Sequence, residues 1–237
     1  MSLDSRPLGD APVVSSPPER PGAGDGIRIA LLDGAVDASH PDLREARIRR
    51  WPGRRGSFAR PVLRGTSPHA TGCASLLVGQ GVAQRRGLVP EATLLACDVL
   101  GGADDARDVA EALLWATRMG AHIAVMPFGR LTGSAAVARA VALAAARGVA
   151  LFAAAGNLGP ENLTFPAWLP EVAAVTAVGP DGVLPECSAR ADLAAPGDAV
   201  EASGPDGTQL MRGSSPASVL AAGHYSQRLM TNVMPTL

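Results

Sequence analysis

A regular alternation of strand-like and helix-like segments along residues 92–156 constrains the fold more than any other feature of the sequence. The strand-like runs ATLLACDVL, HIAVM and VALFAAAG are almost continuously apolar, which is typical of parallel strands that helices cover on both faces. Residues 104–120 and 134–148 lie between these runs and have helical periodicity; the first begins with acidic residues and ends at Gly120. The alternation predicts an α/β fold of three layers, in which helices flank a mostly parallel sheet.

The remainder of the chain fits one domain around this pattern. Its 237 residues suit a single large domain, which we place at residues 27–237. Residues 1–26 are rich in Pro, Gly and Ser, which predicts a flexible N-terminal arm. The frequent Pro and Gly of residues 49–68 predict loops. Further strands are expected at 27–33, 172–179 and 193–197, and further helices at 69–80 and from Ser215 to about residue 230.

Charge and hydropathy argue against two classes of partner. The 21 Lys and Arg against 22 Asp and Glu give a net charge of −1, whereas nucleic-acid-binding proteins show a basic excess or stripe. The basic stretch 44–55 also contains Glu45 and is interpreted as a solvated loop. No apolar run reaches the ~18 residues of a membrane span, and the polar N-terminus does not resemble a signal peptide. We therefore expect a cytoplasmic protein without nucleic-acid or membrane partners.

The three cysteines, Cys73, Cys97 and Cys187, are interpreted as packing residues. An odd number cannot pair completely within one chain, and their spacing matches no zinc motif. Free cysteines behave as small apolar residues and are usual in reducing compartments. The sequence predicts neither a metal site nor a cofactor.

Two polar residues, Asp33 and His69, lie at positions where a carboxylate could pair with an imidazole. Asp33 is the last residue of an apolar strand, and the carboxyl ends of strands are where the working residues of open α/β sheets gather. Its partly desolvated carboxylate would be able to hold an imidazole. His69 follows Pro68 and opens a helix, so it is displayed at a rim. Taken alone, Asp33 also fits a turn residue before Gly34, and His69 fits a surface or hydrogen-bonded histidine.

Two further polar residues suit the chemistry of a developing oxyanion. Asn157 follows the strand that ends at Gly156, and its carboxamide is a fixed N–H donor of the kind an oxyanion needs. Ser215 precedes Pro216, and Pro is favoured at the first position of a helix. Ser215 would therefore lie at a helix N-terminus, where free N–H groups favour negative charge. Taken alone, these residues also fit a turn former and a helix N-cap.

The order Asp33, His69, Ser215 is that of the subtilisin arrangement, and residues 27–224 resemble the subtilisin-like serine proteases almost continuously. IRIALLDGAVDASHPDL resembles the family's Asp segment, HATGCASLLVGQ its His segment, and VALFAAAGN the strand ending in the oxyanion Asn. GSSPASVLAAG resembles the nucleophile signature GTSMASPHVAG. Within the family, LLDGAVDASHPDL, GAHIAVM and LPEVAAVTAVGPDG resemble the protease domains of cyanobactin peptide maturation.

The resemblance implies a subtilisin-like fold, a peptide or protein substrate and cofactor-free catalysis. In that mechanism Ser215 attacks a peptide carbonyl, His69 takes its proton, and Asp33 fixes the imidazole tautomer. Asn157 and the Ser215 N–H would hold the oxyanion. The family's substrate-lining stretch corresponds here to residues 127–129, that is, Pro127, Phe128 and Gly129.

Departures from the family pattern concern positions outside the triad. Gly72 stands where the family has a second His, and Pro127 replaces a Ser that helps to bind the substrate backbone. Val219 and Leu220 replace a Pro-His pair. Asp42 matches a calcium ligand of many members, but the loop that completes that site is missing after Gln80, so no calcium is expected.

Three functions are therefore weighed. The first is an endopeptidase that trims a dedicated precursor peptide, which the intact Asp33, His69, Asn157 and Ser215 favour. The second is a protease-fold binding or scaffold protein without turnover, which Gly72 and the other departures suggest. The third is a nucleotide-binding α/β protein, which the lack of a Gly-rich phosphate motif after any strand argues against.

Overall fold

The computed structural model describes residues 12–13, 23–53, 65–83, 86–101, 105–184, 186–188 and 190–233. Most of the predicted arm at 1–26 lies outside these residues. Of its described part, Val13 forms an isolated parallel bridge with Ala194, and Ala23 is buried. The boundary at residue 26 stays a prediction.

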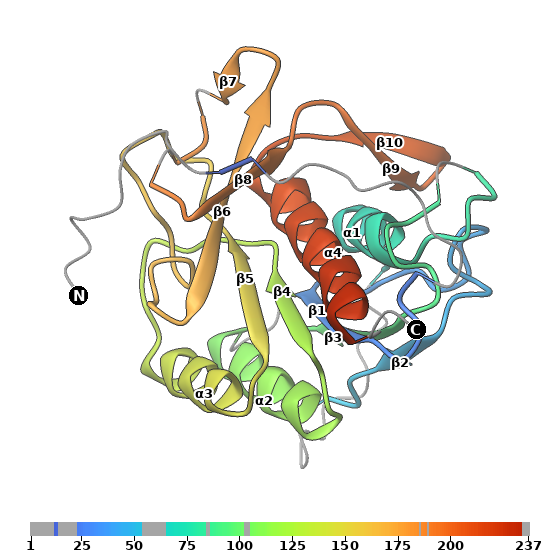
Figure 1. Ribbon diagram of the computed structural model, residues 1–237, viewed down its shortest axis with the longest axis horizontal. Helices are drawn as coiled ribbons and strands as arrows, with labels where there is room; N and C mark the ends of the chain where they lie inside the picture. The colour runs from blue at the N-terminus through green and yellow to red at the C-terminus, as the bar shows by residue number, and fades with distance from the viewer. Residues whose placement is uncertain are drawn as a thin grey trace.

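A mostly parallel sheet forms the centre of the molecule (Figure 1). Its strand order is β2-β3-β1-β4-β5-β6-β7, with β8 pairing β6, and all pairs except β6–β7 are parallel. The strands are β1 (Arg28–Asp33), β2 (Ile48–Arg50), β3 (Thr93–Asp98), β4 (Ile123–Met126), β5 (Ala150–Ala154), β6 (Val172–Gly179), β7 (Gly182–Val183) and β8 (Leu193–Pro196).

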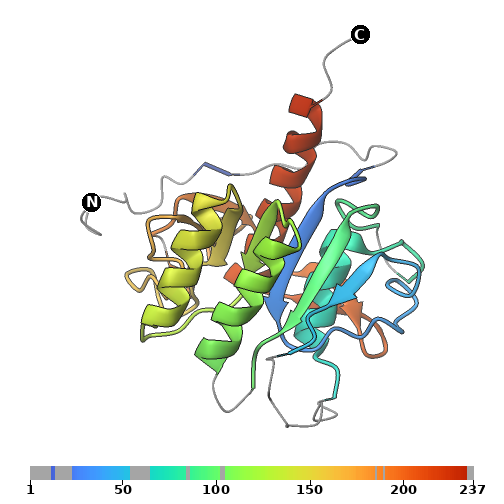
Figure 2. The same cartoon turned by 90° about the horizontal axis from the view of Figure 1, so that it is seen from below.

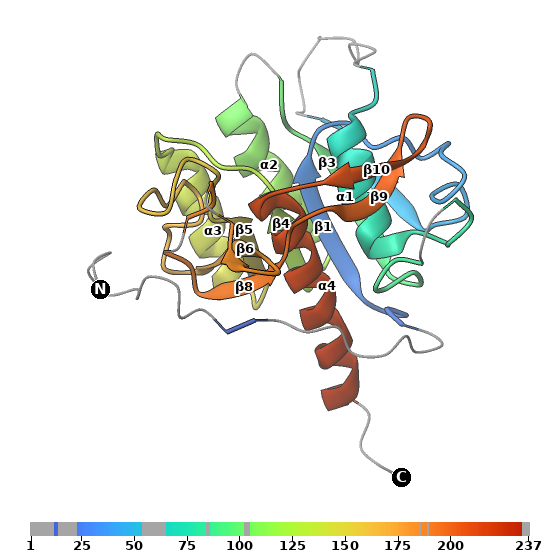
Figure 3. The ribbon, with the colours of Figure 1, turned by 90° about the horizontal axis from the view of Figure 1, so that it is seen from above.

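Helices cover both faces of this sheet, so the predicted three-layer α/β architecture is confirmed. Two helices, α1 (Pro68–Val78) and α4 (Ser214–Val233), lie on one face and two, α2 (Asp105–Arg118) and α3 (Ala135–Ala146), on the other, as Figures 2 and 3 show from opposite sides. The alternate residues of β1 divide between the two layers: Ile29 and Leu31 join the core under α1 and α4, and Ala30 and Leu32 join the core under α2 and α3. Burial on both faces explains why the strands are continuously apolar.

Local sequence signals fix where the helices begin. Ser67 caps α1, its hydroxyl accepting a hydrogen bond from the Ala70 N–H, and Pro68 is the first helical residue. Ser134 caps α3 in the same way. Such side chains satisfy N–H groups that have no partner inside the helix. The cap of α1 places His69 in the first turn, at the rim where the sequence predicted it.

Strands β2, β7, β9 (Val200–Gly204) and β10 (Gly207–Met211) were not predicted. Strand β2 lies partly within the segment expected as loops. It is an edge strand whose Arg49 and Arg50 are exposed, so it lacks the apolar run of the central strands. The antiparallel hairpin of β9 and β10 packs on α1 (Figure 3). Its strands are short and only partly apolar, so they lack the periodic signal of a strand.

All three cysteines are buried and free, as their interpretation as small buried residues predicts. Within the part of the chain that the structure describes, no helix combines the length and hydropathy needed to cross a membrane.

Candidate active site

The parallel sheet brings the predicted site residues to its carboxyl edge. Asp33 ends β1, residues 127–129 follow β4, and Asn157 lies just beyond β5. Because β1, β4 and β5 are neighbours in the sheet, these segments lie side by side. Ser215 joins them from the first turn of α4, which packs on β4 and β5.

Asp33 and His69 form a hydrogen-bonded pair. The Asp33 side chain is buried, and its Oδ2 lies 2.8 Å from His69 Nδ1. Its Oδ1 accepts a hydrogen bond of 2.7 Å from the Gly34 N–H. Both carboxylate oxygens are therefore engaged, which fixes the carboxylate and makes Nδ1 the nitrogen through which it orients the imidazole. This leaves Nε2 of the partly exposed His69 as the nitrogen available for proton transfer.

The charge of Asp33 tunes the imidazole. Burial alone would lower the pKa of His69, but the hydrogen bond and the negative charge of Asp33 outweigh it, so the pKa lies above its ordinary value. A stabilised imidazolium is what a general base needs after it has taken a proton.

Cys73 lies one helical turn after His69, with its Sγ 3.9 Å from His69 Nδ1. Burial, and then the charge of Asp33, raise the pKa of this thiol well above its ordinary value, so it stays protonated. Among the described residues, Asp33, His69 and Cys73 are grouped closely enough to hold a metal ion. The carboxylate and the imidazole are already bonded to each other, however, and a protonated thiol is a poor ligand. We therefore interpret Cys73 as packing beneath the pair.

The amide of Asn157 is oriented by hydrogen bonds to its oxygen. Oδ1 accepts from the Ser214 N–H at 3.0 Å, the Ser214 hydroxyl at 2.8 Å and the Cys187 thiol at 3.2 Å. Because all three donors bind the oxygen, they fix which way the amide faces. Its Nδ2 group, on this exposed residue, is then available to donate to a ligand. Gly213 is needed beside it, since its φ is +105° and a Cβ there would lie 2.6 Å from Asn157 Nδ2.

The Ser215 hydroxyl donates a hydrogen bond of 2.7 Å to the carbonyl oxygen of Pro127. Among the described residues, no hydrogen bond joins Ser215 to His69. Rotation of the Ser215 side chain would redirect the hydroxyl, and catalytic hydrogen bonds often form only when substrate binds. The Pro127 carbonyl therefore borders the site next to the Ser215 hydroxyl.

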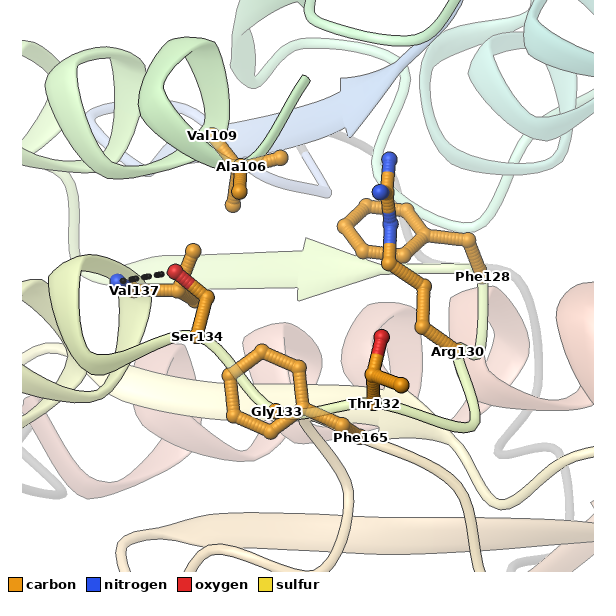
Figure 4. A pocket seen from close by; sticks show the side chains of 9 residues that line it. All are labelled: Ala106, Val109, Phe128, Arg130, Thr132, Gly133, Ser134, Val137 and Phe165. Atoms are coloured by element: carbon orange, nitrogen blue, oxygen red, sulfur yellow. Dashed lines mark hydrogen bonds between the residues drawn. The ribbon is translucent and has the colours of Figure 1, made fainter. Parts of the chain in front are cut away.

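A pocket opens beside Phe128, between the N-terminal ends of α2 and α3 (Figure 4). Its walls are largely apolar, and at its edge the Arg130 guanidinium forms an ion pair of 2.7 Å with Asp105. The backbone of Arg130 is held by two hydrogen bonds to Phe165, each of 2.9 Å. The pocket is lined by Ala106, Val109, Phe128, Arg130, Thr132, Gly133, Ser134, Val137 and Phe165.

The surroundings of Asp42 do not fit calcium. Its carboxylate is fully buried, and Oδ1 accepts hydrogen bonds from the N–H groups of Val82 and Ala83 at 2.6 and 2.8 Å. Its Oδ2 accepts from the Ser203 hydroxyl at 2.7 Å. Hydrogen-bond donors thus point at both oxygens of the carboxylate, and a cation would have to displace them. Asp42 instead joins the 82–83 loop to the β9–β10 hairpin.

Sequence reasoning missed two residues of the site. Ser214 orients Asn157, and Thr164 packs between the segments on either side of Ser215, as described below. Ser214 could have been suspected from its place directly before Ser215 in the nucleophile-like segment GSSPASVLAAG. Nothing in the sequence singled out Thr164.

The fold and the edge-of-sheet site define a subtilisin-like α/β protein. The model of the subtilase family matches residues 24–229. The chain belongs to the subtilase family, which confirms the resemblance seen in the sequence.

Alkaline elastase YaB of Bacillus sp. (strain YaB) is 33% identical over an alignment of 225 residues, which covers 90% of this chain and 56% of that protein. The chain thus spans little more than half the length of this relative. The solved structure of the prenylagaramide maturation protease PagA is 28% identical with a TM-score of 0.79, over 89% of this chain and 78% of that one. The patellamide maturation protease PatA is 29% identical with a TM-score of 0.72, over 90% and 83%. These neighbours agree with the resemblance to cyanobactin-maturation proteases.

Proposed function

We propose that this chain is a serine endopeptidase with Asp33, His69 and Ser215 as its catalytic triad. Ser215 Oγ attacks the scissile carbonyl carbon while His69 Nε2 takes the hydroxyl proton. His69 then returns the proton to the leaving amine, and water releases the acyl group in a second cycle. Asp33 holds the imidazole and stabilises its charged form. The reaction needs no cofactor.

One observation carries the proposal: the 2.8 Å hydrogen bond between the buried Asp33 carboxylate and His69 Nδ1. A buried carboxylate facing a partly exposed imidazole at a sheet edge has few structural uses. As part of a triad it selects the tautomer in which Nε2 can accept a proton. Membership of the subtilase family supports the same roles.

Oxyanion stabilisation is assigned to Asn157 Nδ2 and the Ser215 N–H. The Ser214 hydroxyl fixes the amide before substrate arrives, because it donates to Oδ1 at 2.8 Å and accepts from the Gly156 N–H at 3.2 Å. A donor that is already oriented costs no reorganisation as charge develops, and donors of this kind are worth several kcal/mol in the transition state.

The proposed substrate is one precursor peptide rather than proteins in general. Pro127, Phe128 and Gly129 are the proposed substrate-binding residues; Pro127 offers no N–H to an extended chain, so only the other two can donate a backbone hydrogen bond to it. The pocket beside Phe128, with the Arg130–Asp105 ion pair at its edge, would select one side chain. PagA and PatA are maturation proteases by title, and we extend that class of substrate to this chain.

We place the protein in the cytoplasm, where its three buried free cysteines suit a reducing environment. The net charge of −1 supports a proposal without nucleic acid as partner. No membrane partner is part of the proposal either.

Labelling with a fluorophosphonate tests the function directly. The reagent is expected to modify Ser215 of the wild type and to leave Ser215→Ala unmodified. Ser226→Ala is the matched control, because Ser226 is a buried serine on the same helix whose hydroxyl donates to the Ala222 carbonyl at 2.8 Å. Equal labelling of Ser215→Ala would refute the nucleophile. A folded wild type that does not label would favour the catalytically silent scaffold.

A further inference from the structure

Thr164 fills the space between the two segments that flank Ser215. It is 2% exposed. A Cβ at Gly129 would overlap Thr164 Oγ1 and lie 2.8 Å from its Cβ, and a Cβ at Gly156 would lie 2.5 Å from Thr164 Cγ2. The backbones of the 127–129 and 154–157 segments therefore both pack directly on this one side chain.

Hydrogen bonds hold Thr164 in this position. Its backbone N–H donates to the Ala155 carbonyl at 2.9 Å, and its hydroxyl donates to the same oxygen at 3.1 Å. Its own carbonyl accepts from the Trp168 N–H at 3.2 Å. Because backbone and side chain are tied to the end of β5 together, Thr164 cannot swing aside without losing buried hydrogen bonds.

We propose that Thr164 restricts the residue on the acyl side of the scissile bond to glycine, alanine or serine. This inference rests on the proposed function. Ser215 lies between the two segments, since its hydroxyl bonds to the Pro127 carbonyl and the neighbouring Ser214 hydroxyl bonds to the Gly156 N–H. With Ser215 Oγ bonded to the acyl carbon and the oxyanion at Asn157 Nδ2, we therefore place the acyl residue between residues 127–129 and 154–157. Its side chain then points into the gap that Thr164 fills.

A large side chain has room elsewhere. Phe165 follows Thr164 directly, and its ring forms a wall of the pocket beside Phe128 (Figure 4). That pocket is open, whereas the gap next to Ser215 is filled. The site therefore combines a small residue at the scissile bond with a larger apolar residue farther along the peptide.

The test uses peptidyl diphenyl phosphonates that share one peptide and carry the alanine, leucine or phenylalanine side chain at phosphorus. Ser215 Oγ forms a bond to phosphorus and phenoxide leaves, so the labelling rate reports how that side chain fits. Forcing a large side chain into a rigid, filled gap is strongly unfavourable. We therefore expect the wild type to label about 100-fold faster with the alanine than with the phenylalanine reagent. In Thr164→Gly the ratio is expected to fall below about 10-fold.

Two variants separate volume from hydrogen bonding. Thr164→Val keeps the volume and loses the hydroxyl, so it should keep the wild-type selectivity. Thr164→Ser keeps the hydroxyl and loses only the methyl group, so it should label faster with the leucine reagent even if Thr164→Gly does not fold. Thr176→Ala, a change at a buried threonine of β6 that pairs with β8, is the control that should change nothing.

The outcomes distinguish this inference from the proposed function. Equal wild-type rates with the alanine and phenylalanine reagents would overturn the role of Thr164, provided that a simple fluorophosphonate still labels Ser215. Loss of selectivity in Thr164→Val would also overturn it. A folded wild type that no reagent labels would overturn the proposed function itself, and this inference with it.

Discussion

Replacing Ser203 by alanine would leave one oxygen of a buried carboxylate without its donor. Ser203 and Asp42 are both fully buried, and the Ser203 hydroxyl supplies the 2.7 Å hydrogen bond to Asp42 Oδ2. Hydrogen bonds to charged groups are worth about 1.5–3 kcal/mol, and an unsatisfied buried charge costs at least as much. We expect Ser203→Ala to lower the free energy of unfolding by about 2 kcal/mol. For a chain of this length that corresponds to roughly 4–8 °C in Tm.

Thermal and urea unfolding followed by circular dichroism would measure the loss. Ser226→Ala is the control, since it also removes one buried serine hydroxyl, but that hydroxyl bonds to a neutral helix carbonyl that keeps its helical partner. Its cost is expected to stay near 0.5–1 kcal/mol. If Ser203→Ala costs no more than Ser226→Ala, the Asp42 cluster does not stabilise the fold as the geometry implies.

Calcium provides the second arm of this experiment. Because hydrogen-bond donors already occupy Asp42, EDTA and added calcium should both leave the wild-type Tm unchanged. If EDTA lowered the Tm by several degrees, a bound metal would stabilise the fold. That result would refute the conclusion that the hydrogen bonds to Asp42 leave no place for calcium.

Two predictions concern the proposed chemistry. Asp33→Asn should lower kcat by about 10⁴-fold. It should also shift the acid limb of the kcat/KM profile to lower pH, because it removes the charge that raises the pKa of His69 while burial still lowers that pKa. A pH–rate profile whose acid limb does not move would contradict this. Asn157→Ala should lower kcat by about 10²–10³-fold with little change in KM. Its control is Asn162→Ala, which alters an exposed asparagine of the same loop whose side-chain amide donates to the Leu158 carbonyl. Equal kcat values in both variants would make Asn157 a turn former.

The central sheet was predictable because burial on both faces leaves a direct trace in the sequence. Strands β1, β3 and β4 lie within the expected segments, and their ends differ from expectation by no more than two residues. Helices α1 and α3 start at serine caps, which are local signals. The β9–β10 hairpin left no such trace, because what holds it is its packing on α1. A Cβ at Gly72 would lie 2.7 Å from both Gln209 Nε2 and Met211 Sδ, so a histidine at Gly72 would require the ends of both side chains to move.

The site was only partly predictable for a similar reason. Asp33, His69, Asn157 and Ser215 stand at element ends, where position alone made them candidates, and the family resemblance gave them roles. The functions of Ser214 and Thr164 depend on contacts with residues far away in the chain. Such contacts follow from the packing of β5, α4 and their loops, which a single sequence does not display.

Helix α4, which bears Ser215, is also the last described element to be synthesised. It packs on β4, β5, β6 and β8, so it can dock only after those strands have been made and have paired. The Asp33–His69 pair lies on β1 and α1, which come earlier in the chain than all four of those strands. A chain that is still being synthesised can therefore hold its candidate base before it holds its candidate nucleophile. The candidate site is completed only when α4 docks on a nearly finished sheet, so an unfinished chain of the proposed peptidase lacks its nucleophile.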